Sequence, residues 1–256
     1  MPLPRRFLAA LAWSVSLASC GDDGGTGRVA LQLATRMTTP MAISASASPI
    51  TAGGDEIVIE QVEMVLRKIK VTGIGAGECA ATSGIEAEGD TGTCGEFRAG
   101  PALFDLPLVE GAVPAFTATV PAGSYSQVQL QIHRPTNANE DAAFVADHPA
   151  FENTSIRVTG TYRNTGDGAP VPFTYTTDVT EVVNVELDQP IEVAAGAELG
   201  VTLSVDLSGW FADAAGTGLV NPAQALDGQP LESLVEQNIR RSFRMFEDEN
   251  ADGAAD

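Results

Sequence analysis

The chain of 256 residues carries 14 lysines and arginines against 34 aspartates and glutamates, a formal net charge of −20 at pH 7. So acidic a chain is repelled by nucleic acids and by anionic lipid surfaces, and we expect no nucleic-acid partner. Its length suits one large β domain or two small ones.

The N-terminus has the features of a bacterial export signal. Arg5-Arg6 precede an apolar run, Phe7 to Leu17, that is too short to cross a membrane as a stable helix. The run ends in Leu17-Ala18-Ser19-Cys20, which resembles the lipobox of bacterial lipoproteins, where cleavage before the cysteine accompanies lipid attachment to its sulfur. The resemblance implies a signal peptide at 1–19, lipidation of Cys20 and a flexible tether at 20–27.

The predicted localisation is the bacterial cell envelope, with the protein held at the membrane through its lipid. Two or more acyl chains make such an anchor stable, at about 0.8 kcal/mol for each buried methylene. Gly21 stands where an aspartate would follow the cysteine. This resembles the pattern of lipoproteins sent to the outer membrane, if the cell has two membranes.

Two further cysteines, Cys79 and Cys94, remain in the exported part of the chain. An oxidising compartment favours their pairing. The bridge would close a loop rich in glycine and acidic residues, which the chain-entropy model values at about 3 kcal/mol. Because no histidine accompanies the pair in the pattern of a zinc site, we predict a structural disulfide.

Apolar residues at every second position predict strands along most of the chain. The first is Arg28 to Ala34, and residues 35–54 then form a long loop or a poorly ordered stretch. Ile57 to Val71 also fits a helical stripe, but its seven β-branched residues favour a long bent strand or two short ones. Residues 73–100 form the loop that the disulfide would hold. Further strands are predicted at 103–108, 116–120, 128–132, 156–162, 171–175, 183–187 and 199–207.

Strands with one apolar face must hide it against another sheet. The pattern predicts an all-β fold, an antiparallel β-sandwich of immunoglobulin-like or prealbumin-like type, over residues 28–210. It forms either one unit or two halves near 28–135 and 150–210.

The end of the chain has a different period. From Pro230 to Phe246, apolar residues recur at spacings of three and four, which predicts an amphipathic helix packed against the sandwich. Residues 211–246 are therefore expected to be a helical C-terminal segment, followed by an acidic tail at 247–256.

Three motifs resemble an uncharacterised domain family of bacterial envelope lipoproteins. They are V-L-R-K-I-K-V from Val65 to Val71, F-D-L-P-L-x-x-G from Phe104 to Gly111, and P-A-G-S-Y-S-Q-V-Q-L from Pro121 to Leu130. The resemblance covers roughly residues 28–135. It implies secretion and a β-sandwich, and it supplies no activity and no site residues.

No catalytic motif is recognisable. The chain has two histidines, His133 and His148, and neither a G-x-S-x-G nor an H-E-x-x-H motif. We therefore predict a protein that is not an enzyme. The alternative is an exported hydrolase whose groups meet only in the folded chain. A deep pocket holding a histidine against a carboxylate of shifted pKa would favour the hydrolase, whereas an exposed aromatic-lined groove would favour a binding protein.

The tail has the ligand spacing of a calcium loop. With Asp248 first, Asn250 is third, Asp252 fifth, the carbonyl of Ala254 seventh and Asp256 ninth, with a glycine sixth. This spacing resembles an EF-hand loop and the aspartate-rich units of thrombospondin type 3 repeats. The bidentate ligand at position twelve is missing, so the tail is either a weak calcium site or a solubilising segment.

The function predicted from the sequence is binding or structural. A non-catalytic lipoprotein would present its loops to a glycan or to another envelope protein, with calcium as its candidate cofactor. A purely structural envelope component is the third hypothesis.

Overall fold

A computed structural model describes residues 25–36, 49–73, 94–98, 100–109, 111–166 and 169–255. The predicted signal peptide, Cys20, Cys79 and Asp256 lie outside these residues, as does the side chain of Cys94. The lipid anchor and the disulfide therefore stay predictions.

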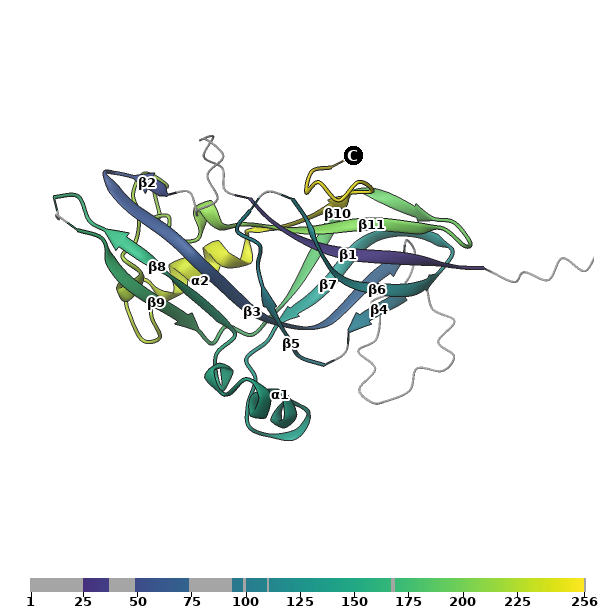
Figure 1. Ribbon diagram of the computed structural model, residues 1–256, viewed down its shortest axis with the longest axis horizontal. Helices are drawn as coiled ribbons and strands as arrows, with labels where there is room; N and C mark the ends of the chain where they lie inside the picture. Colours follow the sequence, from purple (N-terminus) through teal and green to yellow (C-terminus); the bar gives the residue numbers. More distant parts are fainter. Residues whose placement is uncertain are drawn as a thin grey trace, which may run out of the picture.

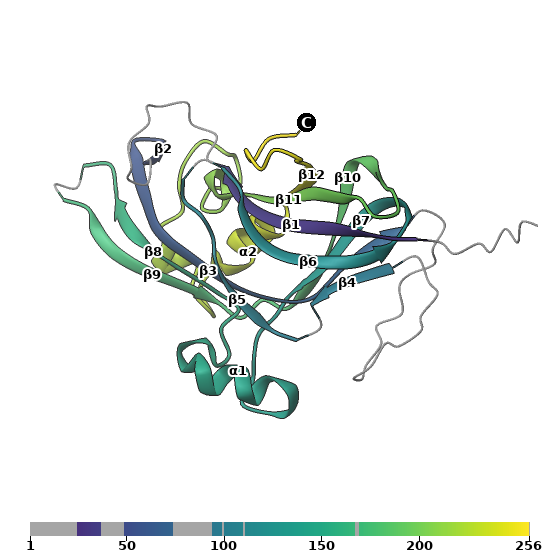
Figure 2. The same cartoon turned by 45° about the vertical axis from the view of Figure 1, so that its right-hand side comes forward.

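The described residues form a β-rich fold whose strands join in one curled sheet (Figures 1 and 2). The main path runs β6-β1-β11-β12-β10-β7-β3-β8-β9, and β2, β4 and β5 each pair with β3. The strands are β1 (Thr26–Arg36), β2 (Ile50–Ala52), β3 (Asp55–Gly73), β4 (Cys94–Arg98), β5 (Ala102–Asp105), β6 (Val113–Pro121), β7 (Gly123–Ile132), β8 (Ile156–Arg163), β9 (Val171–Thr177), β10 (Glu181–Val193), β11 (Glu198–Asp206) and β12 (Phe243–Glu247).

The long strand β3 organises the sheet. Its 19 residues confirm the strand interpretation of Ile57 to Val71. The strand is irregular at Lys68, whose φ of 52° is unusual for a residue with a side chain, and its register with β7 shifts between Arg67 and Lys70. β3 is therefore one long strand interrupted by a bulge.

Strands β7 and β8 follow one another along the same edge of β3. Val65 shows this directly, because its N–H donates to the carbonyl of Ser155 and its carbonyl accepts from the N–H of His133. The two groups of one residue in a strand point to the same side. The chain thus leaves the sheet after Ile132 and returns at Ile156, and we call residues 133–155 the excursion.

The excursion carries the short helix α1 (Ala142–Asp147) between two 3-10 turns, η1 (Asn139–Asp141) and η2 (Pro149–Phe151). Figure 1 shows α1 projecting away from the body of the sheet. The sequence reading did not predict this helix, because a single six-residue helix is too short to show a period.

Strand direction departs from the antiparallel expectation at two places. β1 runs parallel to β11, and β10 is parallel to β12 through the pair Leu187 and Met245. Parallel neighbours need a long crossover connection, and most of the chain separates β1 from β11. Alternation within a strand reports its buried face and carries no information about the direction of its neighbour.

The apolar faces meet in one hydrophobic cluster that includes residues of strands throughout the described chain. The clearest sequence signal, Leu199, Val201, Leu203, Val205 and Leu207, is buried at all five positions. The pleating inferred for this strand is confirmed. Hydrogen bonding of β1 to β11 and of β3 to β8 places the two predicted halves in a shared sheet.

Helix α2 (Glu232–Arg240) lies inside the range predicted for the C-terminal helix and buries Val235 and Ile239. The predicted extension to Phe246 is wrong, because the chain turns at Ser242 and enters β12. Phe243 and Met245 pair there with Val205 and Leu203 of β11. Between β11 and α2 the described helical turns are η3 (Leu207–Gly209) and η4 (Pro222–Gln224).

Candidate functional site

An open groove of about 810 Å³ lies between the excursion and strands β5 and β6. Phe104 of β5 and Phe116 of β6 line one wall, with ring centroids 5.4 Å apart in an edge-to-face arrangement. Phe144 and His148 line the other wall, and their rings stand 4.7 Å apart. The groove thus offers aromatic surface on both sides.

Carboxylates surround this aromatic surface. The exposed acidic residues on the groove are Asp105, Glu140 and Asp147. Asp105 accepts a hydrogen bond from the side chain of Gln61 at 3.4 Å, and Glu140 pairs with Arg67 at 2.8 Å. The groove therefore combines apolar ring edges with hydrogen-bond acceptors and an excess of negative charge.

The other histidine, His133, is buried at the start of the excursion. The Nε2 atom of His133 lies 2.9 Å from both carboxylate oxygens of Asp141, and each residue is 5% exposed. Asp141 also accepts from the backbone N–H of Thr136. His133 does not line the groove. The pair holds the start of the excursion against β3.

Burial lowers the pKa of His133 below its ordinary value of 6.5. Its hydrogen bond to Asp141 acts in the opposite direction, and the nearby Arg67 guanidinium lowers the pKa further. Since burial is the largest influence, His133 is neutral near pH 7. It acts as a structural residue in this arrangement.

The C-terminal loop folds back on the sheet, and Asp248 is its fixed point. The carboxylate of Asp248 is fully buried and accepts from the hydroxyl of Thr202 at 2.7 Å. It also accepts from the backbone N–H groups of Asp252, at 3.1 Å, and Gly253, at 3.0 Å. The tail loop is therefore held by the body of the protein.

The rest of the loop repeats this pattern of side chains accepting from backbone. Asn250 accepts from the N–H of Asp252 at 2.9 Å, and Asp252 accepts from the N–H of Ala254 at 2.8 Å. Gly253 has a φ of 81°, which residues with side chains rarely adopt. Asp248, Asn250, Asp252 and Ala254 thus lie in one compact turn, while Asp256 lies beyond the described part.

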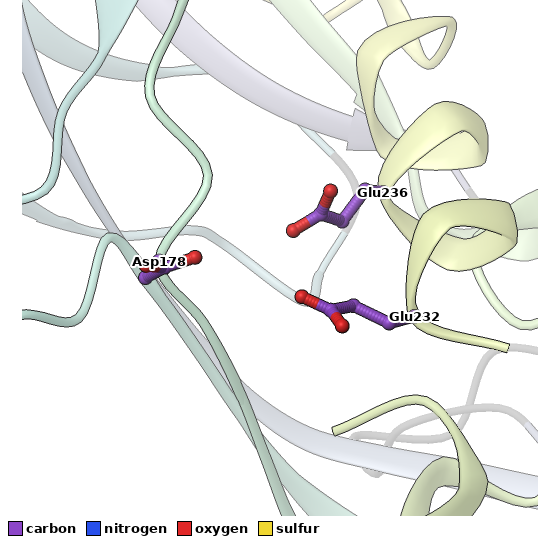
Figure 3. A group of neighbouring side chains, drawn as sticks. All are labelled: Asp178, Glu232 and Glu236. Carbon is purple, nitrogen blue, oxygen red and sulfur yellow. The ribbon is translucent and has the colours of Figure 1, made fainter. Parts of the chain in front are cut away.

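A further acidic group was not found from the sequence. Asp178, Glu232 and Glu236 each bring a carboxylate oxygen to within 4.8 Å of the other two, and such a group could hold a metal ion. Figure 3 shows Glu232 and Glu236 extending from one side of α2 toward Asp178. We call these three residues the α2 cluster.

Only part of the α2 cluster could have been recognised from the sequence. Glu232 and Glu236 are spaced to share one side of a helix. Asp178 is more than fifty positions away, and it joins them because α2 packs beside the junction of β9 and β10. That contact depends on tertiary structure alone.

Comparisons with known proteins do not assign a family. No model of a known protein family matches the chain, and a search of curated proteins found no match. Among solved structures, MbnP from Methylosinus trichosporium is similar, with a TM-score of 0.41 and 10% identity over 73% of this chain and 79% of that chain. This similarity is too low to support a functional argument. No helix within the described ranges is long and apolar enough to cross a membrane.

Proposed function

We propose that this protein is a non-catalytic lipoprotein of the bacterial envelope that binds a glycan in the groove between the excursion and strands β5 and β6. The observation that carries the proposal is the combination of aromatic walls and carboxylates in an open groove. Sugar rings have apolar faces and hydroxyl donors, and these match aromatic surface and acceptor oxygens. Because the groove is acidic, the glycan would be uncharged or basic.

The location of the histidines favours binding over hydrolysis by a histidine base. His148 lines the groove beside Phe144, and the histidine that does pair with a carboxylate, His133, is buried away from the groove. A hydrolase with a histidine base would need that histidine paired with a carboxylate and facing the bound substrate.

The proposal includes the predicted anchor and the two-layer arrangement. Lipid on Cys20 would hold the domain at the membrane through the tether at 20–27. The strand group β6-β1-β11-β12 and the remaining strands would act as the two layers of a sandwich. Their shared hydrophobic cluster supports this arrangement.

We also propose that the tail loop binds calcium weakly. Its support is the compact turn in which the side chains of Asp248, Asn250 and Asp252 each accept from backbone N–H groups of the loop. Without a ligand at position twelve, the dissociation constant is expected at about 1 mM or above. Calorimetric titration with calcium chloride would then show a weak step that Asp252→Asn removes.

Retention on immobilised envelope polysaccharides tests the glycan proposal. The wild-type chain in detergent is compared with the double variant Phe144→Ala, His148→Ala. A matched control is Val182→Ser, which changes an exposed apolar residue of β10. Retention should be lost in the groove variant and kept in the control. Equal retention of the wild type, the groove variant and the control would contradict the glycan proposal. Binding of a protein partner in place of a glycan would also contradict it.

The anchor has a separate test. Replacement of Cys20 by serine should abolish labelling by a fatty-acid probe in cells. Labelling that persists in this variant would contradict lipidation at Cys20, whatever the outcome of the glycan experiment.

A further inference from the structure

The α2 cluster brings together like charges that the fold could have kept apart. Glu232 and Glu236 are one turn apart on α2, and like charges at this spacing destabilise a helix. Asp178, at the start of the link between β9 and β10, adds a third carboxylate within 4.8 Å. Such an arrangement needs compensating positive charge.

Two arginines supply only part of that charge. Arg134 pairs with Asp178 at 2.6 Å, and Arg240 contacts Glu236 at 3.4 Å. Arg240 is also shared with Glu181, with which it forms a close ion pair. Around the cluster, four carboxylates therefore face two guanidinium groups.

Neutral donors orient the carboxylates. The hydroxyl of Thr177 donates to Glu236 at 2.7 Å, and the backbone N–H of Gly228 donates to Glu232 at 2.8 Å. Arg134 occupies one oxygen of Asp178. Each carboxylate is thus held in place from outside the cluster, and their oxygens converge between α2 and the sheet (Figure 3).

A second, independent observation concerns Tyr175. Its ring packs edge-to-face against Phe211, and its hydroxyl is fully buried without a hydrogen-bond partner among the described residues. A buried hydroxyl without a partner is costly. Tyr175 precedes Thr177 by two positions on β9, so both side chains lie on the same face of the strand, toward Glu236.

The Tyr175 side chain lies on the face of β9 from which Thr177 reaches the cluster. Burial raises the pKa of the phenol, the hydroxyl of Thr177 lowers it, and the carboxylates of Glu236 and Glu232 raise it again. The phenol is therefore a neutral donor, and among the described residues no acceptor lies at hydrogen-bonding distance from it.

We propose that the α2 cluster is a binding site for a divalent cation, with calcium as the preferred ion. Asp178, Glu232 and Glu236 each supply oxygen, and water completes the coordination shell. All-oxygen ligands without histidine or cysteine suit calcium better than zinc or copper. A water molecule on the ion provides the acceptor that Tyr175 lacks. The ion joins α2 to the junction of β9 and β10, and this site is separate from the tail loop.

The test is a titration of the full chain in detergent with calcium chloride, followed by calorimetry and by thermal unfolding. The main variant is Glu232→Gln, which keeps the shape of the side chain and removes one charged ligand. Without calcium, this variant should be at least as stable as the wild type, because a repulsion is removed. With calcium, the wild type should gain stability and the variant should bind about tenfold more weakly or worse.

Two further variants separate the alternatives. Asp178→Asn, at a partly exposed position, should weaken calcium binding in the same way. This variant replaces Glu232→Gln in the test if Glu232→Gln does not fold. Asp252→Asn, in the tail loop, should leave the α2 step unchanged. Terbium luminescence gives a second readout: terbium replaces calcium, and emission excited through tyrosine should fall in Tyr175→Phe.

Three outcomes would overturn the proposal. One is an absence of calcium binding by the wild type up to about 10 mM, beyond the weak end of the extracellular range. Another is an equal calcium response in the wild type and in folded Glu232→Gln and Asp178→Asn variants. The third is a response that disappears entirely in Asp252→Asn, which would assign all binding to the tail.

Discussion

Gly160 of β8 passes so close to β3 that a Cβ atom at this position would lie 2.0 Å from the carbonyl oxygen of Val58. The contact atom is backbone in the middle of a ladder, so it cannot move aside as a flexible side chain would. Glycine at this position is a requirement of the pairing between β3 and β8.

We expect Gly160→Ala to destabilise the protein by about 1–3 kcal/mol, the usual cost of overpacking. Gly123→Ala is a matched control, because a Cβ at this strand position meets nothing within 4 Å. Urea unfolding followed by circular dichroism measures both. Equal unfolding midpoints for the two variants would contradict this prediction. They would show that β3 and β8 accommodate the added methyl group without a loss of stability.

The pair of His133 and Asp141 predicts a dependence of stability on pH. Because the folded pKa of His133 is lowered, its stabilising effect is complete above pH 6.5 and is lost as the pH falls toward the folded value. Arg67, Glu140 and Asp141 are the charged groups that act on it. The wild type should therefore lose stability as the pH falls below about 6.5.

Replacement of His133 by glutamine removes the titrating group. The variant is expected to be less stable at pH 7.5 and to show a shallower loss on acidification, measured as the free energy of unfolding in urea. A slope identical to that of the wild type would mean that other groups cause the dependence.

Asp248 predicts how firmly the tail is held. Asp248→Ala leaves the hydroxyl of Thr202 and the N–H groups of Asp252 and Gly253 without their acceptor. We expect a loss of about 1–3 kcal/mol and faster proteolysis after β12. Asp252→Asn keeps an acceptor oxygen for Ala254 and should have little effect in the absence of calcium. Similar proteolysis of both variants would argue against the anchoring role of Asp248.

Asp55 connects the turn between β2 and β3 to Thr165, which follows β8. The backbone N–H of Thr165 and then its hydroxyl lower the pKa of Asp55 below the ordinary 3.8, and the hydroxyl of Tyr162 contributes in the same direction. The stabilisation is therefore present above pH 3.8 and is lost as the pH falls through the folded pKa.

In Asp55→Asn, the loss of stability relative to the wild type should be full at pH 7 and should shrink as the pH falls below about 4. Unfolding midpoints at pH 7, 5 and 3 test this. Glu192→Gln, at an exposed position of β10, is the control. A difference that stays constant over this range would contradict the assigned cause.

The sequence predicted the strands well because alternation is a local signal that burial of one face imposes. The predictions for Leu199 to Leu207 and for Ile57 to Val71 both rested on this signal. The predicted end of the C-terminal helix was wrong because Phe243 and Phe246 fit both a helical and a strand pattern. Pairing with β11, which the local sequence does not show, makes this segment a strand. The position of the groove was not predictable, since Phe104, Phe116 and Phe144 come from three separate segments.

The excursion begins beside Leu66 and ends beside Met64, two positions apart on the same strand. An altered excursion can therefore be attached at the same two points while the ladders on either side of them stay intact. Since it supplies one whole wall of the groove, the shape and charge of the groove can diverge among descendants of this fold while the framework is inherited unchanged.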